Sequence, residues 1–216
     1  MKKVITLMLI IALTVPALAQ SGAQHKRNRF NHNNTEQYYG LRLGLNVAAI
    51  GSDNINHDTD SRTGFTFGGV YGFQLANSTP LWLEAGLLYS EKGGKMSLVD
   101  DTRNSHKVTY SLNYLQVPIV VKYSFDVADD LYIQPFLGGY LAMGIAGKTK
   151  DYLERDSHSV YDDFNRFDGG LRIGCGAEYQ MVYAEVGFDF GLANISKQDF
   201  ESAHNRNLFI TVGVNF

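Results

Sequence analysis

An all-β fold, an eight-stranded antiparallel up-and-down transmembrane β-barrel, is predicted by three features of this 216-residue sequence. Eight segments alternate in side-chain character with a period of two, as strands with two different faces do. Long and short connections follow one another strictly between these segments. Large apolar side chains occupy one face of the segments, and glycines and charged residues occupy the other.

The first twenty residues have the features of a secretory signal peptide. Lys2 and Lys3 form a basic start, an apolar run covers residues 4–15, and Ala17-Leu18-Ala19 has the small-x-small pattern that signal peptidase reads. A membrane anchor is the alternative, but the run is short against the ~20 apolar residues of a spanning helix. We therefore expect cleavage after Ala19. The predicted organisation is a signal peptide at 1–19, a polar periplasmic leader at 20–37 and one barrel domain at 38–216.

Most of the alternating segments have about the ~9–11 residues that a tilted strand needs to cross a bilayer. In the second, Phe65, Phe67 and Tyr71 share one face, while Thr66 and Gly68 share the other. We expect strands at Tyr38–Ile50, Arg62–Gln74, Leu81–Ser90, Val108–Phe125, Leu131–Ile145, Phe164–Tyr179, Val182–Ala193 and Arg206–Phe216.

The connections between these strands alternate in length. The long ones are Gly51–Ser61, Glu91–Lys107, Ala146–Asp163 and Asn194–Asn205, and the short ones are Leu75–Pro80, Asp126–Asp130 and Gln180-Met181. Outer-membrane barrels have long outside loops and short periplasmic turns. This pattern predicts a location in the cell outer membrane with both termini in the periplasm.

Side-chain volume decides which face points outward. An eight-stranded barrel has an interior just wide enough for its own side chains or one small ligand, so the many large apolar rings must face lipid. Aromatic residues near the strand ends predict a girdle at the membrane interface: Tyr38, Tyr39, Tyr89, Tyr123, Phe125 and Tyr179. The last strand ends in Phe216 after alternating apolar residues, which predicts the signal read by the barrel assembly machinery: Leu208, Ile210, Val212, Val214 and Phe216.

Charged residues on the inward face must pair, because an isolated buried charge costs several kcal/mol. The two-residue turn at Gln180-Met181 places Arg172 opposite Asp189 on neighbouring strands. Glu84 and Lys122 lie about three residues from the periplasmic ends of adjacent strands and form a second expected pair. The predicted lumen charge network, with a structural role as its default, is Arg42, Glu84, Lys122, Asp168, Arg172, Glu178, Glu185 and Asp189.

Four motifs resemble those of the PorT-like outer-membrane β-barrel family. Tyr114–Tyr123 resembles "YLxIPLLxKY", Asp168–Tyr179 resembles "DxGxxxGxGxEY", Gly191–Ile195 resembles "GLxNI", and the last strand is similar to "RNxxxxxxGxxF". The resemblance covers nearly the whole mature chain and implies a barrel fold. It implies a link to secretion or transport at most, since most members have no established activity and barrel motifs reflect fold.

No catalytic, cofactor or metal site is predicted. The sequence has no G-x-S-x-G elbow, P-loop, dinucleotide fingerprint or CxxC, and its six histidines lack ligand spacing. Ser90, Ser105 and Ser159 are candidate nucleophiles only by their expected place at the outer rim, so we expect no enzyme. Cys175, the single cysteine, excludes an internal disulfide and is expected to be a buried thiol.

We expect a non-enzymatic envelope component, structural or partner-binding, with long outside loops. Its expected partners are outer-membrane lipid and lipopolysaccharide, the barrel assembly machinery during biogenesis, and a protein at the outside loops. Nucleic acid is not expected, because the formal charge of −3 becomes about −5 when the two lysines leave with the signal peptide. The alternative is a secreted, soluble, lipocalin-like barrel that carries a hydrophobic ligand in its lumen.

Overall fold

The computed structural model describes residues 37–52, 60–76, 79–99, 105–151, 157–162, 164–196 and 203–216. Its strands are β1 (Gln37–Ser52), β2 (Asp60–Ala76), β3 (Thr79–Val99), β4 (Ser105–Tyr123), β5 (Phe125–Ala128), β6 (Leu131–Asp151), β7 (Ser157–Ser159), β8 (Phe167–Tyr179), β9 (Val182–Gly191) and β10 (Ala203–Asn215). A 3-10 helix, η2, covers Val160–Asp162. The predicted signal peptide and leader lie outside the described residues, apart from Gln37.

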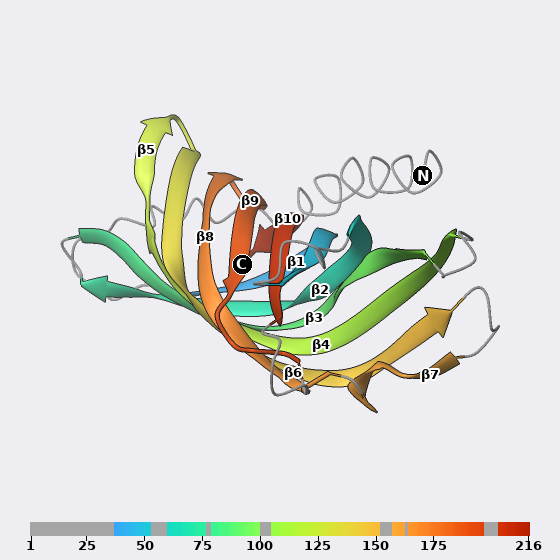
Figure 1. The fold of residues 1–216 in the computed structure, drawn as a ribbon. Helices are drawn as coiled ribbons and strands as arrows, with labels where there is room; N and C mark the ends of the chain where they lie inside the picture. Colours follow the sequence, from blue (N-terminus) through green and yellow to red (C-terminus); the bar gives the residue numbers. More distant parts are fainter. Residues whose placement is uncertain are drawn as a thin grey trace.

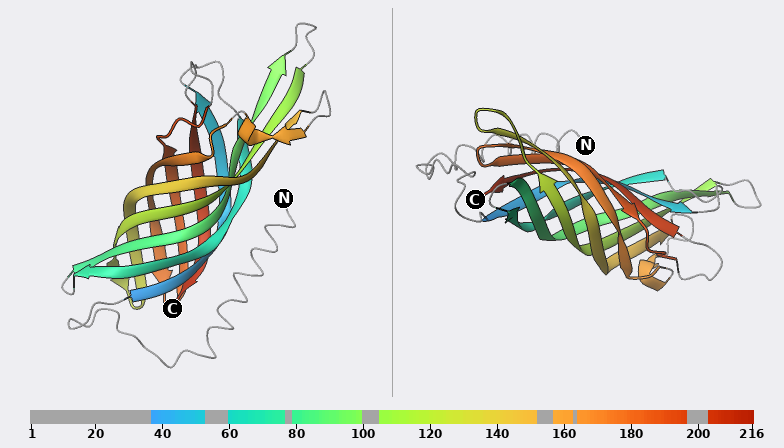
Figure 2. Two further views of the ribbon diagram at one scale, coloured as in Figure 1. Left: turned by 90° about the horizontal axis from the view of Figure 1, so that it is seen from below. Right: turned by 90° about the vertical axis from the view of Figure 1, so that its left-hand side faces the viewer.

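Eight long strands close into an antiparallel barrel (Figures 1 and 2). Their hydrogen-bonded order is β4-β3-β2-β1-β10-β9-β8-β6, and β6 pairs with β4 to complete the circle. The first and last strands pair along their length, from Gly40 opposite Asn215 to Ser52 opposite Ala203. Because closure leaves no free edge between these eight strands, the predicted up-and-down barrel is confirmed.

The two short strands are extensions of this barrel. β5 follows β4 after a break at Ser124, whose backbone N–H donates to Pro80 O at 2.9 Å, and β5 pairs with β6. β7 pairs with the far end of β6. We call the end with the Asp129-Asp130 and Gln180-Met181 turns the turn end, and the opposite end the loop end. No helix among the described residues is long and apolar enough to span a membrane.

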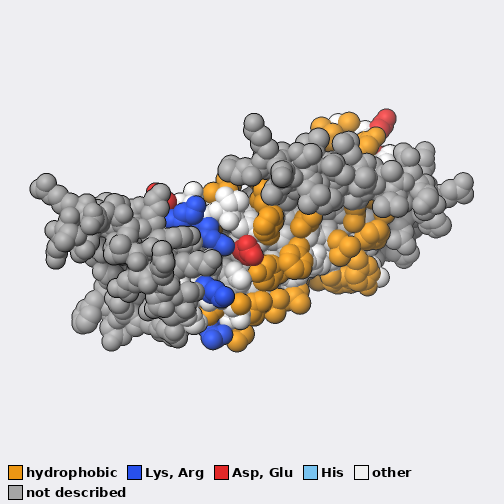
Figure 3. All heavy atoms as spheres, turned by 90° about the vertical axis from the view of Figure 1, so that its right-hand side faces the viewer, with side chains coloured by type: hydrophobic (Ala, Val, Ile, Leu, Met, Phe, Trp, Pro, Cys, Tyr) orange, Lys and Arg blue, Asp and Glu red, His pale blue; other side chains and the backbone are white. Residues whose placement is uncertain are grey.

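Side chains alternate between the two faces of the barrel wall as the sequence predicts. On β2, Phe65 and Phe67 are 43% and 52% exposed, whereas Thr66 between them is buried. Equivalent apolar side chains on the other strands form a broad belt around the outside, which Figure 3 shows on one side of the molecule. Cys175 also lies on this outer surface, so the expectation of a buried thiol is wrong. Its position alternates with Gly174 and Gly176, which face inward.

Inward-facing glycines make room for aromatic rings that also lie inside. A Cβ at Gly72 would overlap the ring of Tyr38 on the neighbouring strand, and a Cβ at Gly176 would overlap Tyr183. Both tyrosines are buried. The interior therefore holds large rings as well as charges, and glycines facing those rings keep the total volume within what the wall can enclose.

Tyr38 does not belong to the aromatic girdle, which corrects one expectation. It is 4% exposed, its ring lies 5.4 Å from the ring of Trp82, and its hydroxyl donates to Glu84. Tyr39 points outward, so the period of two turns Tyr38 inward. Four of the other predicted girdle residues are exposed on the outer surface and Tyr89 is half-buried: Tyr39, Tyr89, Tyr123, Phe125 and Tyr179.

The strands β3 and β6 reach well beyond their predicted ends at the loop end, and β4 begins at Ser105, shortly before its predicted start at Val108. Much of the expected 91–107 connection belongs to a β3–β4 hairpin, in which Lys95 lies opposite Thr109. Figure 2 shows this hairpin projecting past the rest of the barrel. The polar residues of these segments were expected to form loops. A strand that extends beyond the bilayer meets water on its outer face, however, and can be polar there. Ser90 therefore lies inside the wall and is buried, not at the outer rim.

Candidate functional site

All eight residues of the predicted lumen charge network are buried inside the barrel. Each has a relative exposure of 9% or less, and they come from five strands: Arg42 on β1, Glu84 on β3, Lys122 on β4, Asp168, Arg172 and Glu178 on β8, and Glu185 and Asp189 on β9. The pleat positions them, because each occupies an inward position of its strand. Their contacts divide the lumen into a part near the turn end and a part near the loop end.

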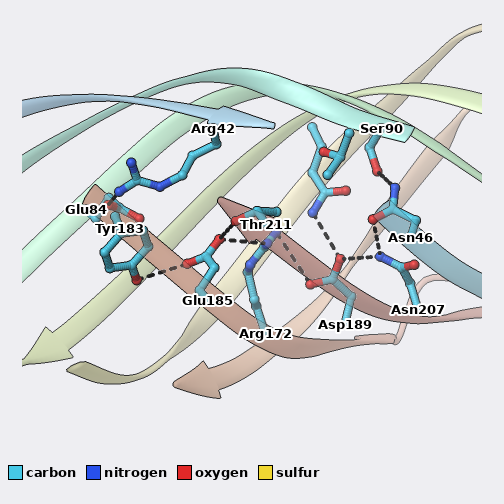
Figure 4. Close-up of polar contacts among 12 residues, drawn as sticks. Arg42, Asn46, Glu84, Ser90, Arg172, Tyr183, Glu185, Asp189, Asn207 and Thr211 are labelled. Atoms are coloured by element: carbon cyan, nitrogen blue, oxygen red, sulfur yellow. Dashed lines mark hydrogen bonds and ion pairs between the residues drawn. The ribbon is translucent and has the colours of Figure 1, made fainter. Parts of the chain in front are cut away.

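The pair Arg172–Asp189 lies at the middle of the lumen. The two residues are directly opposite each other in the β8–β9 register, and Arg172 Nη1 lies 3.6 Å from Asp189 Oδ1 (Figure 4). The guanidinium also lies 4.0 Å from Glu185 Oε1 and stacks 3.8 Å from the centroid of the Phe209 ring. One arginine thus holds two carboxylates of β9 that are four residues apart.

Glu84 is the centre of the network nearer the turn end. Its Oε2 lies 2.8 Å from Lys122 Nζ and 3.2 Å from Arg42 Nη2, and it accepts a hydrogen bond of 2.6 Å from the Tyr38 hydroxyl. Lys122 faces Trp82 across the β3–β4 register, so its bond to Glu84 is diagonal. Three donors on one carboxylate compensate the cost of burying its charge.

Tyr183 connects these two groups of charges. Its hydroxyl accepts from Lys122 Nζ at 2.8 Å and donates to Glu185 Oε2 at 3.0 Å. The Arg42 guanidinium lies 4.1 Å from the centroid of the same ring (Figure 4). Glu185 Oε1 also accepts from the hydroxyl of Thr211 on β10. The network is therefore continuous from Glu84 to Asp189.

Lys92 belongs to the network but was not among its predicted members. It is fully buried, and its Nζ lies 3.5 Å from Asp168 Oδ2, 3.8 Å from Asp189 Oδ2 and 4.1 Å from the centroid of the Tyr140 ring. Its expected place was the outside connection Glu91–Lys107, where the surrounding residues are polar. The alternation of side chains along β3 does indicate its inward position, since Lys92 continues the series of inward residues Glu84, Leu88 and Ser90.

Amide side chains complete the hydrogen bonding of the carboxylates. Asp189 Oδ2 accepts from Gln116 Nε2 at 3.2 Å and from Asn207 Nδ2 at 3.3 Å. Asn207 also donates to Asn46 Oδ1, and Asn46 donates to Ser90 Oγ (Figure 4). Since these amides come from three different strands, β1, β4 and β10, they tie the wall together across the lumen.

Glu178 lies near the turn end and accepts hydrogen bonds from two amides. It accepts from Gln134 Nε2 at 3.2 Å and from Asn215 Nδ2 at 2.8 Å. Asn215 Oδ1 accepts in turn from Arg42 Nη1 at 2.7 Å. Asn215 therefore links Glu178 to the main network, and only its inward position on the last strand could have indicated this role from the sequence.

Buried apolar clusters lie among the charges and beyond them at the loop end. At the loop end, η2 and neighbouring segments contribute to a buried cluster of Ile50, Leu112, Tyr114, Tyr140, Ala142, Val160, Tyr161 and Ile195. The Tyr161 hydroxyl donates to Asn113 O and to Ala146 O, at 3.1 and 3.2 Å, and burial raises its pKa to about 12. Toward the turn end, a second cluster consists of Tyr38, Val70, Trp82 and Leu88.

The other chemistry-bearing residues are not assembled into a site. Ser90 accepts from Asn46, Ser159 is exposed and accepts from Tyr161 N, and the side chain of Ser105 lies outside the described residues. His204 Nδ1 lies 3.1 Å from Ala193 O. Within the described ranges, no group of three or more His, Cys, Asp or Glu side chains is arranged to hold a metal ion.

The residues of the predicted assembly signal share the outer face of β10 and the chain end. Leu208, Ile210 and Phe216 are exposed, and Val212 and Val214 are half-buried. Phe216 exchanges backbone hydrogen bonds with Tyr39, at 2.8 and 3.2 Å, so the end of the chain is paired into the closing seam. The last strand thus presents a continuous apolar stripe beside β1.

Comparisons with known proteins agree with this architecture. Residues 21–197 match the model of a family described as outer membrane protein beta-barrel domain. The fold is similar to that of Ail, the attachment invasion locus protein of Yersinia pestis (13% identity, 84% of this chain and 99% of that chain covered, TM-score 0.44). It is also similar to Neisserial surface protein A (16%, 85% and 98%, 0.47) and to OprG from Pseudomonas aeruginosa (10%, 86% and 98%, 0.45). No curated protein sequence matches the chain.

Proposed function

The chain belongs to the outer membrane protein beta-barrel domain family, and from this premise we propose that it is a non-enzymatic, non-conducting structural component of the outer membrane whose loop end binds a partner. The outer membrane is the location that the family implies. The finer role rests on how the lumen is filled.

The observation that supports a closed barrel is that all eight long strands contribute buried side chains to its interior. Charges and amides lie along the lumen from Glu178 to Asp168, with apolar side chains among them and a further apolar cluster at the loop end. A diffusion pore needs a water-filled passage, which only wider barrels have. A filled lumen leaves the outer surface and the loop end as the places where this protein meets other molecules.

The soluble, lipocalin-like alternative is not favoured. Such a carrier needs an apolar cavity inside and a polar surface outside. Here four cations and five carboxylates are buried among the described residues, while Leu137, Ile173 and Phe190, among many others, are about half exposed on the outside. That distribution suits lipid outside the barrel and no hydrophobic cargo within it.

The orientation and processing follow from the same proposal. The N-terminal features support a signal peptide cleaved after Ala19, and the termini lie in the periplasm with the loop end outside. The apolar stripe of β10 is read by the barrel assembly machinery during insertion. The four sequence motifs support a place among the PorT-like barrels, a resemblance that carries no secretion role of its own.

Two measurements on the purified mature chain test the proposal. We expect heat-modifiable mobility on gels after extraction with detergent, and no single-channel currents in planar bilayers. A chain recovered in the soluble fraction contradicts the membrane role, and steady currents through the folded protein contradict the closed lumen. Crosslinking in intact envelopes, followed by isolation of the barrel, identifies the partner at the loop end.

A further inference from the structure

The exposed charged side chains that the structure describes differ in sign between the two ends of the barrel, with Asp60 at the loop end as the exception. At the turn end, they are Asp126, Asp129 and Asp130, all acidic. At the loop end, the exposed cations with described side chains lie at or beyond the edge of the apolar belt: Lys95, Lys148, Arg166 and Arg206. Figure 3 shows basic side chains in this border region. We call these four residues the basic rim.

Two members of the basic rim lie directly next to belt residues. Arg206 is on the outer face of β10, two residues from exposed Leu208, and pairs in register with Phe190. Arg166 precedes Phe167, which is 57% exposed. A long cationic side chain beside the end of an apolar belt can extend its charge to the level of lipid headgroups while its stem stays against the apolar surface.

The rim cations are available for an outside ligand. Arg166 makes one weak hydrogen bond to Gly144 O, at 3.4 Å, and its guanidinium lies over the Tyr161 ring. Among the residues that the structure describes, none of the four is ion-paired with a carboxylate. Asp60 and half-buried Glu91 are the acidic residues near the rim whose side chains the structure describes, and Glu91 already accepts from Phe65 N and the Tyr89 hydroxyl.

We propose that the basic rim binds the phosphate groups of a phosphorylated glycolipid headgroup in the leaflet at the loop end. This inference rests on the proposed membrane location. Guanidinium groups make charge-assisted, often bidentate bonds to phosphate oxygens. A lipid source is favoured over a free anion, because Arg166 and Arg206 border the apolar belt, where acyl chains and phosphate groups can be contacted together.

Native mass spectrometry of the full folded chain in neutral detergent tests this proposal. The probes are lipid A with two phosphate groups, the same lipid after removal of its phosphates, phosphatidylglycerol and inorganic phosphate. We expect the bisphosphorylated lipid to bind at least tenfold more tightly than the dephosphorylated form. The double variant Lys148→Gln/Arg206→Gln should weaken binding by about fivefold per cation, or about 25-fold. Its matched control, Asp126→Asn/Asp129→Asn, removes two charges at the turn end and should leave binding within about twofold.

Three outcomes overturn the inference: equal binding of the two forms of lipid A, phosphatidylglycerol bound as tightly as lipid A, or inorganic phosphate displacing the lipid at millimolar concentration. Arg206→Lys, which keeps the charge, should recover most of the affinity lost in Arg206→Gln. If the barrel folds with heat-modifiable mobility but binds both forms of lipid A equally, only the inference about the basic rim is contradicted. A chain that never folds in detergent removes the proposed function as well, so the two failures can be distinguished.

Discussion

Replacing Lys92 by methionine tests whether the buried charges form one stabilising network. Methionine keeps most of the volume of the lysine stem, so the change removes mainly the ammonium group. Asp168 is the residue most affected, because its Oδ2 lies 3.5 Å from Lys92 Nζ, and its remaining donors are Asn205 Nδ2 and the Tyr140 hydroxyl. Asp189 keeps its contact with Arg172 at 3.6 Å.

The expected loss follows from leaving one carboxylate without its cation. Breaking a fully buried pair by removing one partner costs about 3–5 kcal/mol. Asp168 keeps neutral donors, which offset part of this cost, but the ammonium also lies over the Tyr140 ring at 4.1 Å, a contact that adds up to about 2 kcal/mol when desolvated. We therefore expect Lys92→Met to lower the free energy of unfolding by about 3–4 kcal/mol.

The assay is urea unfolding of the refolded barrel in lipid vesicles, with heat-modifiable gel mobility as a second readout. The matched control is Lys148→Met on β6, an exposed lysine whose removal should change stability by no more than about 0.5 kcal/mol. Adding Asp168→Asn to Lys92→Met removes the uncompensated charge and should recover more than half of the loss. A change below about 1 kcal/mol for Lys92→Met, or no recovery in the double variant, refutes the reasoning.

Four further changes test other parts of the structure. Arg172→Ala should lower the unfolding free energy by about 3 kcal/mol or more in the same urea assay, because Asp189 and Glu185 both lose their guanidinium; unchanged heat resistance on gels contradicts a stabilising network. Gly72→Val should destabilise by about 1–3 kcal/mol through overlap with a buried ring, whereas Gly69→Val should not, because a Cβ there would meet only Gly40 O, at 3.8 Å. Gln180→Gly should stabilise by about 1 kcal/mol in urea unfolding, since φ is +56° there. Tyr161→Phe should make the free energy of unfolding less dependent on pH between about 10 and about 12, measured in the same urea assay. The wild type loses stability over this range, because the fold favours the neutral phenol of Tyr161.

The pair Arg172–Asp189 could be located from the sequence because a turn fixed its register. Gln180-Met181 is a two-residue connection, and Tyr179 lies opposite Val182 across it. Counting back along two strands of known parity then identifies the residue opposite any other. Glu84–Lys122 was expected only from similar heights on adjacent strands, and the structure shows a diagonal contact of 2.8 Å.

Lys92 was expected in an outside loop and Tyr38 in the outer girdle, but both side chains are buried in the lumen. The two predictions were wrong because polarity and aromaticity do not mark where a strand ends. The strand β3 continues past Ser90, where its outer face is no longer apolar, so the sequence there has the polar composition of a loop. A tyrosine at the end of a strand fits an interfacial girdle and an inner plug equally well. Only the alternation with outward-facing Tyr39 shows that Tyr38 points inward. For both Tyr38 and Lys92, alternation along the strand therefore predicts the face of the wall better than residue type does.

The filled lumen also explains why the fold was easier to predict than the function. An eight-stranded wall encloses so little space that its inward residues must be small, stacked or paired whatever the protein does. We propose that charges which in a larger protein would indicate chemistry fill and close the interior here, and the several donors on Glu84 and Glu185 support this role. Specificity must then lie where the wall imposes no such constraint. That leaves the outer border with lipid and the loop end, where the exposed cations of the basic rim are concentrated.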